Sequence, residues 1–339
     1  MSAKVETIRV TESDAGLRLD RWVRGRFPHV GQGFLQKLLR SGQIRVNGRR
    51  VEAGHRLGRG DEIRVPPTVR QAPKAADGAD FKPPPSTSAA DRDLIEQSIL
   101  YEDDEVLLLN KPFGLAVQGG TGTRRHIDGM LAGMVDRFGE RPRLVHRLDR
   151  DTTGVLLVAK TRQAAAKLGR TFQTRAAAKT YWALVKGVPR PPQGKIEAAL
   201  VKASGPDGDR VRKARPGEQD KAMHATTHYS VIDRATHKCA WVSLKPVTGR
   251  QHQLRAHMAS IGHPIIGDLK YLEGDQTGLE NALEQKLHLH ARRLIIPHPS
   301  SGEQIDVTAP LPQHMRDSLS KLGFDPERWT AQEHSEGSP

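Results

Sequence analysis

The feature that most constrains the fold is a proline-rich stretch that separates two parts of the chain. Residues 66–85 contain six prolines and a single bulky aromatic residue, Phe81. This stretch and the residues that follow it, through residue 90, show no hydrophobic period and cannot bury enough apolar surface to offset their chain entropy. We therefore predict a small domain at 1–65, a proline-rich linker at 66–92, a large domain at 93–325 and a polar tail at 326–339.

The balance of charge restricts the partners of this chain. Its 53 Lys and Arg residues exceed its 39 Asp and Glu residues, which gives a formal net charge of +14. Residues 1–65 hold fourteen of the basic residues and seven of the acidic ones, and thus carry half of this net charge. Such an excess favours a polyanionic partner, either nucleic acid or an anionic membrane surface.

Several classes of protein are excluded. The longest apolar runs, such as residues 155–159, are far shorter than the ~20 residues of a membrane span. The first twenty residues contain acidic side chains and no apolar core, so we expect no secretory signal. Cys239 is the only cysteine and cannot form an internal disulfide or a Cys-rich zinc site. We expect a chain with no membrane partner that works in a reducing compartment, the cytoplasm.

Residues 1–65 have the pattern of two short helices followed by a hairpin. An apolar helical spacing over residues 19–27 ends at a proline, and a second one over residues 34–39 ends at a glycine. Residues 43–46 then alternate between polar and apolar into Asn47–Gly48, a strong hairpin signal. We expect the arginines around these elements to bind RNA rather than to form an ordinary solvated face, namely Arg18, Arg21, Arg40, Arg45, Arg49 and Arg50.

This part of the chain resembles a known RNA-binding family. The resemblance runs from residues 17–20 (Leu-Arg-Leu-Asp) through residues 42–48 (Gly-Gln-Ile-Arg-Val-Asn-Gly) to residues 60–65 (Gly-Asp-Glu-Ile-Arg-Val). These blocks are similar to the S4 domain, a small α/β domain whose helix pair and hairpin grip structured RNA. The resemblance implies that residues 1–65 are an S4-like RNA-binding domain.

The large domain reads as α+β. Short apolar segments outnumber helical ones, which favours a mixed, largely antiparallel sheet over a doubly wound fold. No glycine-rich phosphate loop precedes a helix, so a nucleotide cofactor is not expected. The predicted strands are at residues 106–110, 155–159, 181–185, 242–246 and 287–296, and a helix is predicted at residues 251–260.

One polar loop is the main candidate for catalysis. Residues 146–154 (His-Arg-Leu-Asp-Arg-Asp-Thr-Thr-Gly) lie directly before a predicted strand. The ordinary interpretation is a surface salt-bridge cluster. The alternative is a catalytic carboxylate, because a carboxylate flanked by arginine is favoured in its charged, nucleophilic form. A two-carboxylate glycosidase would need carboxyl groups ~5–9.5 Å apart, which we do not expect of Asp149 and Asp151.

The fifteen histidines do not form a recognisable metal motif. His252 and His257 are five residues apart, which places them on different sides of a helix. His288 and His290 can share a strand face, but no neighbouring carboxylate or cysteine completes a set of ligands. We therefore expect no metal.

Four blocks of the large domain are similar to the RluA-type family of pseudouridine synthases. Residues 146–160, from His-Arg-Leu-Asp to Val-Ala-Lys, resemble its signature. Residues 110–120, 179–185 and 248–268 resemble its opening turn, its tyrosine block and its C-terminal signature. With the S4 match, the resemblance covers residues 17–312. Gly119–Gly120 and the S4 domain point to the branch that acts on the ribosomal large subunit.

The resemblance implies an isomerase that converts specific uridines of large-subunit rRNA to pseudouridine without a cofactor. Asp149 would be the catalytic carboxylate, and attack on the sugar, attack on the base and abstraction of a sugar proton are all open routes. Arg147 would hold the extruded nucleotide or fill its gap, Tyr181 would stack on the uracil, and Arg255 would pair with Asp149. We expect the chain to be a monomer that acts in rRNA processing.

A second class of function competes with this one. The chain could be a non-catalytic rRNA-binding or ribosome-assembly factor, in which the basic domain binds RNA and the large domain only shapes the surface. The presence of Asp149, Tyr181 and Arg255 together favours the enzyme.

Overall fold

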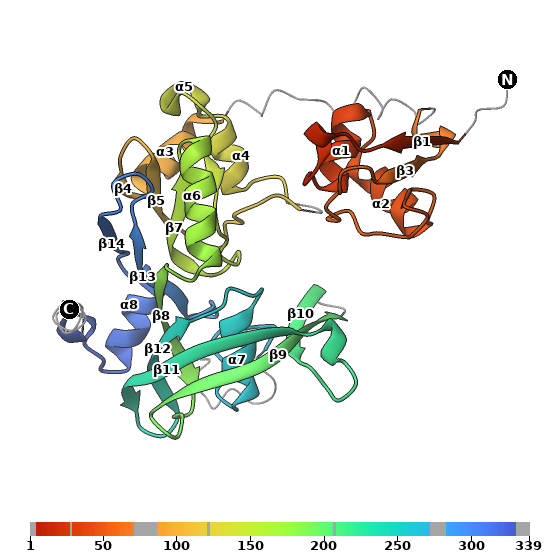
Figure 1. Ribbon diagram of the computed structural model, residues 1–339. Helices are drawn as coiled ribbons and strands as arrows, with labels where there is room; N and C mark the ends of the chain where they lie inside the picture. Colours follow the sequence, from red (N-terminus) through yellow and green to blue (C-terminus); the bar gives the residue numbers. More distant parts are fainter. Residues whose placement is uncertain are drawn as a thin grey trace. The chain divides into compact units, whose positions relative to one another are not determined.

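The chain forms two compact units, Met1–Pro83 and Pro84–Pro339, which we call the N-terminal and the C-terminal unit (Figure 1). The computed structural model describes residues 5–27, 29–70, 87–120, 123–205, 208–271 and 283–329.

The described part of the N-terminal unit is a small α/β structure. A three-stranded antiparallel sheet in the order β1–β3–β2 and two helices share a core that includes Leu19, Leu35 and Ile63. Its elements are β1 (Glu6–Arg9), η1 (Glu12–Asp14), α1 (Leu19–Arg26), α2 (Gln32–Arg40), β2 (Arg45–Val46), β3 (Glu62–Val65) and η2 (Pro67–Val69).

The predicted turn at Asn47–Gly48 is present, but the hairpin after it is not. Asn47 (φ 49°) and Gly48 (φ 73°) both have positive φ, as the tightest hairpin turns require. Beyond the turn only Val46 and Arg49 form a bridge, and β2 pairs with β3 instead. β1, which the sequence pattern did not predict, covers the other edge of β3 and is only partly buried.

The predicted linker, 66–92, is too long at both ends. Val69 in η2 is fully buried in the core of the N-terminal unit. In the C-terminal unit, α3 begins at Ala89, and the Ser88 side chain caps it by accepting a hydrogen bond from the Asp91 amide. Residues 71–86 lie outside the described residues. Of the predicted tail, 326–339, the structure describes only the first four residues, and Trp329 among them packs against the core.

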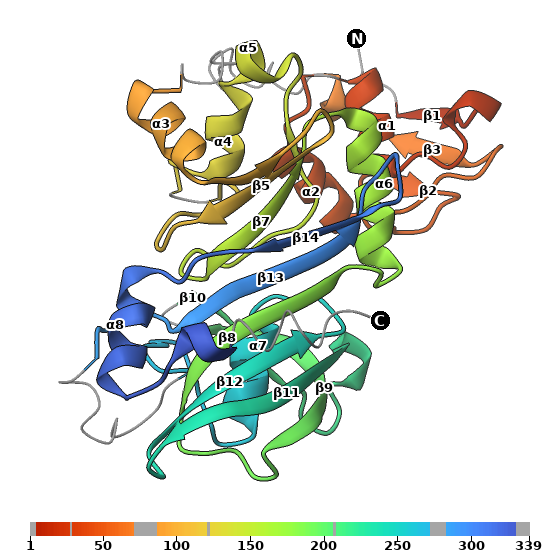
Figure 2. The ribbon, with the colours of Figure 1, turned by 90° about the vertical axis from the view of Figure 1, so that its left-hand side faces the viewer.

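The C-terminal unit is built on one large sheet, shown from two sides in Figures 1 and 2. Its described strands follow the order β10–β9–β11–β12–β8–β13–β7–β5–β4, with β14 beside β13 and β6 beside β7. Among these strands, the pairs are antiparallel except β13 with β7, which confirms the predicted mixed, largely antiparallel sheet. The strands are β4 (Ile99–Glu102), β5 (Val106–Lys111), β6 (Arg143–Leu144), β7 (Thr153–Ala159), β8 (Ala178–Lys186), β9 (Gln193–Gly205), β10 (Gly208–Lys213), β11 (Met223–Ala235), β12 (Cys239–Pro246), β13 (Leu289–Pro297) and β14 (Gln304–Thr308).

Helices cover both faces of this sheet. In β5, Leu107 and Leu109 pack on one face with α3 and α4, whereas Val106 and Leu108 pack on the other face with α6. This double burial explains why the strand is a continuous apolar run instead of an alternating one. The helices are α3 (Ala89–Gln97), α4 (Ile127–Ala132), α5 (Val135–Phe138), α6 (Arg162–Gln173), η3 (Gln219–Lys221), α7 (Gln253–Ser260) and α8 (Gln313–Lys321).

The other half of the sheet is covered in the same way. α7 packs against Ala183 and Val185 of β8, and α8 packs against Trp182 and Leu184, which point to the opposite face. Tyr181 contacts the apolar cluster under α3 and α4 and also the cluster under α7. It therefore lies where the two halves meet, on the face that α7 covers.

Candidate active site

Three of the predicted site residues meet at this junction. Asp149 lies in the loop before β7, Tyr181 in β8 and Arg255 in α7. The Arg255 guanidinium approaches the Asp149 carboxylate with 3.4 Å between Nη1 and Oδ2. The charge of Asp149 also acts on Tyr181, as described below. Segments more than a hundred residues apart in the sequence thus converge on one carboxylate.

The first end of the Asp149 loop is held by His146. Its Nε2 accepts a hydrogen bond of 2.9 Å from the amide of Leu157 in β7, and its ring stacks on Phe172 with 4.8 Å between centroids. Burial, together with the charge of Lys179, lowers the pKa of His146 to about 3. A neutral imidazole is the form that can accept this hydrogen bond, so His146 is a structural anchor at neutral pH.

The other end of the loop enters β7 through Gly154. Its φ of 104° is one that residues with a side chain rarely adopt, and a Cβ would lie 2.2 Å from the carbonyl oxygen of Ala291. Beside it, the Thr153 hydroxyl hydrogen-bonds Nδ1 of His290 at 2.8 Å, where β7 and β13 run in parallel. The close approach of β13 therefore explains the glycine that ends the polar motif.

A buried lysine braces the middle of the loop. Lys111, at the end of β5, is fully buried, and its Nζ donates to the carbonyls of Pro112, Leu115 and Arg150 at 2.8–2.9 Å. Burial lowers the pKa of Lys111 to about 7, an effect that the charges of Asp151 and Asp149 oppose. Three carbonyl acceptors match the three N–H groups of an ammonium, so the geometry favours the protonated form.

Arg255 is held more tightly by a second carboxylate than by Asp149. Asp268 accepts from Nε at 2.7 Å and from Nη2 at 2.6 Å, the bidentate geometry of a strong pair. The side chains of Arg255 and Asp268 are 6% and 0% exposed, whereas that of Asp149 is 25% exposed. Asp268 therefore fixes the guanidinium, and its remaining edge faces a carboxylate that solvent can still reach.

The start of α7 is fixed by a closed set of hydrogen bonds. The Gln253 side chain accepts from the hydroxyl of Thr248 and the amide of Arg250, and it donates to the carbonyl of Thr226 and the hydroxyl of Thr227. All of these contacts are between 2.7 and 3.0 Å. A fully satisfied buried amide of this kind is rigid, so Arg255, two residues later, starts from a fixed backbone.

Tyr181 faces the site as a neutral phenol. Burial raises the pKa of its hydroxyl, and the negative charge of Asp149 raises it further. His252 is the other titratable group nearby, with 3.9 Å between its Nε2 and Oδ2 of Asp149. Burial lowers the pKa of His252, although the charge of Asp149 opposes this. At neutral pH, Arg255 is therefore the cation that Asp149 faces most directly.

Arg147 lies outside this charged cluster. Its side chain is exposed, and Nη1 makes a 3.4 Å contact with Oε1 of Gln118 from the loop after β5. In the described residues, no ion pair or resolved charge interaction links Arg147 to Asp149, Tyr181 or Arg255, whereas Asp149 pairs with Arg255 and its charge acts on Tyr181. An exposed guanidinium two residues before Asp149 is free to contact a bound nucleotide.

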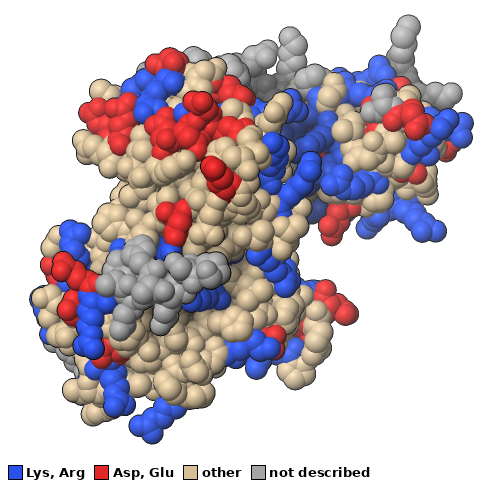
Figure 3. Space-filling view, turned by 60° about the vertical axis from the view of Figure 1, so that its left-hand side comes forward, with Lys and Arg blue, Asp and Glu red and all other residues tan. Residues whose placement is uncertain are grey.

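The predicted RNA-binding arginines of the N-terminal unit differ in how freely they can bind. Arg18 is paired with Asp20, with 2.7 Å between Nη2 and Oδ2. Arg45 is half-buried and donates to the carbonyls of Gly42 and Gly48. The others are exposed, namely Arg21, Arg40, Arg49 and Arg50. Lys and Arg side chains are prominent on this unit in Figure 3.

Sequence reasoning did not assign Asp268, Lys111 or His252 to the site. For Asp268 and Lys111, the sequence contains a local feature that can be recognised once the structure is known. Asp268 follows Gly267, where a Cβ would lie 1.9 Å from the carbonyl oxygen of Lys286. Lys111 is a charged residue that ends a buried apolar strand and precedes a proline. Neither signal shows which partner the side chain meets.

Two kinds of feature are absent from the residues that the structure describes. No group of three or more His, Cys, Asp and Glu side chains in these residues is placed to hold a metal ion. In the same ranges, no helix is both long and apolar enough to cross a membrane.

Comparisons with known proteins agree on one class. A family model described as RNA pseudouridylate synthase matches residues 105–260, and one described as S4 domain matches residues 17–63. Two proteins called ribosomal large subunit pseudouridine synthase C, from Haemophilus ducreyi and Escherichia coli K12, are each 37% identical to the chain. These alignments cover 95% and 94% of this chain and 97% of each relative.

A solved structure shows the same relationship. The structure titled Human RNA Pseudouridylate Synthase Domain Containing 4 superimposes with a TM-score of 0.58 and 33% identity, over 70% of this chain and 96% of that one. The fold and the site thus define an RNA-modifying enzyme with a separate RNA-binding domain. The chain belongs to the RNA pseudouridylate synthase family.

Proposed function

We propose that this protein converts specific uridines of large-subunit rRNA to pseudouridine, with Asp149 as the catalytic carboxylate. The observation that carries this proposal is the position of Asp149, which is partly exposed and faced by the buried guanidinium of Arg255. The names of the relatives that align over nearly the whole chain supply the substrate. The S4 domain supplies a second surface for the same RNA.

The reaction sets clear requirements for the site. The bond between N1 and C1′ breaks, the uracil turns, a bond from C5 to C1′ forms, and a proton leaves C5 while N1 gains one. The target nucleotide must first leave its stack, because neither the sugar carbon nor the base is accessible within a helix. Asp149 would supply the carboxylate beside the sugar and base, Tyr181 would stack on the uracil, and Arg147 would contact the extruded nucleotide or fill its gap.

The electrostatics of the site fit this role for Asp149. A carboxylate that faces an arginine is favoured in its charged form, which is the form that can act as nucleophile or base. Two hydrogen bonds to Asp268 fix the guanidinium of Arg255. Arg255 therefore presents a fixed positive charge that orients Asp149. Preorganised charges of this kind need no rearrangement during the reaction.

We also propose that no cofactor takes part. The reaction exchanges one carbon–nitrogen bond for one carbon–carbon bond within a single nucleotide, so no electrons or groups need to be supplied from outside. We expect pseudouridine formation by the purified chain to continue at an unchanged rate in excess EDTA. Loss of activity that added Mg²⁺ or Zn²⁺ restores, with the RNA fold unchanged by chemical probing, would overturn this part of the proposal.

The competing proposal is a non-catalytic rRNA-binding or assembly factor. Incubating large-subunit rRNA fragments with the protein, followed by carbodiimide treatment and primer extension, distinguishes the two. We expect new stops at specific uridines. Comparing rRNA pseudouridine maps with and without the gene then identifies the sites. Tight binding without any new stop, on naked rRNA and on pre-ribosomal particles alike, would favour the assembly factor.

We place this activity in the cytoplasm and assign it to a monomer. The location follows from the proposed substrate, the large-subunit rRNA. The large hydrophobic residues that are exposed in the described ranges belong to separate elements, such as Tyr101 in β4, Val135 in α5 and Met223 in β11, which favours a monomer. Light scattering at micromolar concentration is expected to give a mass of 37.4 kDa.

Tyr181 provides a test of the stacking role. We expect Tyr181→Phe to bind RNA as the wild type does and to keep turnover within about tenfold, because the aromatic face is retained. Tyr181→Leu removes that face and is expected to lose ~1–3 kcal/mol of interaction with the base. Single-turnover rates at saturating RNA measure both effects. Equal activity of the two variants would show that Tyr181 does not stack on the uracil.

Deleting the N-terminal unit tests whether this unit binds RNA while the C-terminal unit carries out catalysis. The cut belongs at Pro84, because a later cut removes Ser88, the cap of α3. We expect the apparent KM to rise far more than the single-turnover rate at saturating RNA falls. The slope of log affinity against log salt should flatten by ~0.7–0.9 for each phosphate that the deleted unit would have neutralised. An unchanged slope and affinity on natural rRNA would show that this unit does not bind the substrate.

A further inference from the structure

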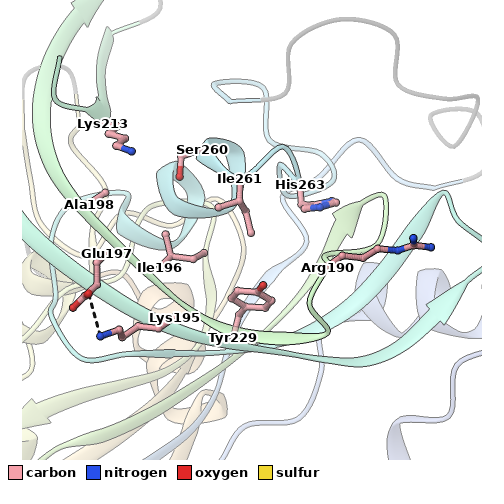
Figure 4. Close-up of a pocket in the computed structure, with 10 residues that line it drawn as sticks. All are labelled: Arg190, Lys195, Ile196, Glu197, Ala198, Lys213, Tyr229, Ser260, Ile261 and His263. Carbon is pink, nitrogen blue, oxygen red and sulfur yellow. Dashed lines mark ion pairs between the residues drawn. The ribbon is translucent and has the colours of Figure 1, made fainter. Parts of the chain in front are cut away.

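A hollow of about 280 Å³ lies at the C-terminal end of α7, away from the end that approaches Asp149 (Figure 4). Its walls come from the turn between β8 and β9, from β9, β10 and β11, and from the residues that end α7. None of the residues that line it belongs to the active-site cluster. It therefore needs an explanation of its own.

The floor of the hollow is apolar and fixed in shape. Tyr229 is 8% exposed, and its hydroxyl donates to the carbonyl of Pro191 at 3.0 Å. Gly194 allows the ring to lie there, since a Cβ at that position would be 2.9 Å from Cε1 of Tyr229. Ile196 is buried beside the ring. The tyrosine hydroxyl is already used, so any ligand is recognised by other groups.

The rim carries three cations, and two of them have no anionic partner in the part of the chain that the structure describes. Arg190, Lys195 and Lys213 are all exposed. Lys195 pairs with Glu197 at 3.0 Å, which lowers the pKa of that carboxyl. Arg190 and Lys213 have no such pair among the described residues, and Figure 4 shows them at opposite ends of the hollow.

A histidine at the edge adds a specific polar atom. His263 is held by a hydrogen bond of 2.9 Å that its Nδ1 donates to the carbonyl oxygen of Lys186. Nε2 has no partner within the described ranges, and it accepts a hydrogen bond when the ring is neutral. A ribose 2′-hydroxyl can donate to such an atom, and this group distinguishes RNA from DNA.

We propose that this hollow is a second RNA-contact site, which binds the phosphodiester backbone of the substrate through Arg190 and Lys213. The inference rests on the proposed function, which makes RNA the polyanion available to these cations. Ser260 in the hollow is five residues after Arg255 on α7, ~7.5 Å along the helix axis. The bound segment is therefore close to the reacting nucleotide.

The charge distribution of the surface supports the same choice of partner. In Figure 3, Asp and Glu gather on the upper left lobe, the part of the C-terminal unit with α3 and α5. The residues that line the hollow include three basic side chains, Arg190, Lys195 and Lys213, and one acidic side chain, Glu197. An RNA strand is therefore attracted to the hollow and repelled by the acidic upper lobe.

The test measures RNA affinity of the full chain as a function of salt. Arg190→Ala combined with Lys213→Ala removes both unpaired cations, and both side chains are exposed, so folding should be unaffected. We expect the slope of log affinity against log salt to flatten by ~1.4, at ~0.7 for each phosphate contact with a single strand. Affinity near 0.15 M salt should fall about tenfold, while the rate at saturating RNA stays at the wild-type value.

The matched control removes the same charge elsewhere. Arg162→Ala combined with Arg170→Ala changes two exposed arginines of α6, on the opposite face of the sheet from α7. We expect wild-type affinity and slope from it. If the Arg190 and Lys213 pair behaves like this control, or loses affinity without a change in slope, the inference is wrong although the proposed function stands. Absence of pseudouridine formation by the wild type would instead reject the function.

A photo-crosslinking residue in place of Lys213 provides an independent measurement. We expect it to crosslink to rRNA within a few nucleotides of the modified uridine. A crosslink only to a ribosomal protein, when pre-ribosomal particles are the substrate, would overturn the inference and identify a different partner for the hollow.

Discussion

The Asp149→Asn variant is expected to form no measurable pseudouridine while its RNA affinity stays within a few-fold of the wild type. The substitution is nearly isosteric and removes the charge on which nucleophilic or basic action depends. The phosphate contacts that dominate affinity lie elsewhere on the chain and persist. Single-turnover assays on rRNA fragments, together with filter binding at fixed salt, measure the two quantities separately.

The matched control for this prediction is Asp151→Asn, a change of the same kind two positions later in the same loop. We expect it to keep most of the activity, because the described structure shows no ion pair between Asp151 and Arg255, and Asp151 acts on Lys111 through its charge. Turnover by Asp149→Asn above about a hundredth of the wild-type rate, the scale expected when a general base is removed, would rule Asp149 out. Equal loss in both variants would revive the two-carboxylate glycosidase type of mechanism.

The second large effect is expected from the pair that Arg255 forms with Asp268. Asp268→Asn leaves a buried guanidinium without its bidentate anion, and breaking a buried pair in this way costs ~3–5 kcal/mol of unfolding free energy. Below the unfolding temperature we expect kcat to fall by roughly 10²-fold, because a misplaced Arg255 no longer orients Asp149. KM should change little. Arg255→Ala is expected to lower kcat in the same way.

A second arginine–aspartate pair separates catalysis from stability. Arg293 in β13 donates to Asp306 in β14 from Nε and Nη2, the same bidentate geometry that Arg255 has with Asp268, and neither residue belongs to the active-site cluster. We expect Asp306→Asn to lower the thermal midpoint modestly and to leave kcat unchanged. If Asp268→Asn loses stability but keeps its kcat at low temperature, Asp268 is structural, and its role in positioning Arg255 is wrong.

The parts of the fold that were predictable have strong local patterns. β5 and β7 are continuous apolar runs, and the Asn47–Gly48 turn has the two positive φ angles that its residues favour. β1 and α3 were missed for the opposite reason. β1 alternates between half-buried and exposed residues, and α3 has one fully buried residue, Ile95. Such elements are stabilised mainly by the contacts they make, which no short window of sequence contains.

The residues of the candidate site were likewise predictable where they lie in a local motif, and their contacts with one another were not. Asp149, Tyr181 and Arg255 could be predicted because each lies in a short sequence motif, at residues 146–154, 179–185 and 248–268. Which carboxylate holds Arg255 was not visible. Asp268 and Asp149 are 13 and 106 residues from it, and both are simply acidic residues after a turn or within a loop.

By itself, the sequence determined that this chain has two folded parts, a basic one suited to RNA and an α+β one with a polar motif before a buried strand. Composition and local periodicity are sufficient for that, because they depend on each segment alone. Only the tertiary structure showed that Arg255 pairs more tightly with Asp268 than with Asp149 and that Lys111 hydrogen-bonds the loop of Asp149. It also showed that a hollow with basic residues on its rim lies at the C-terminal end of α7. Those facts depend on distances of about 3 Å between segments far apart in the chain, and such distances are set by how the sheet brings its strands and helices together.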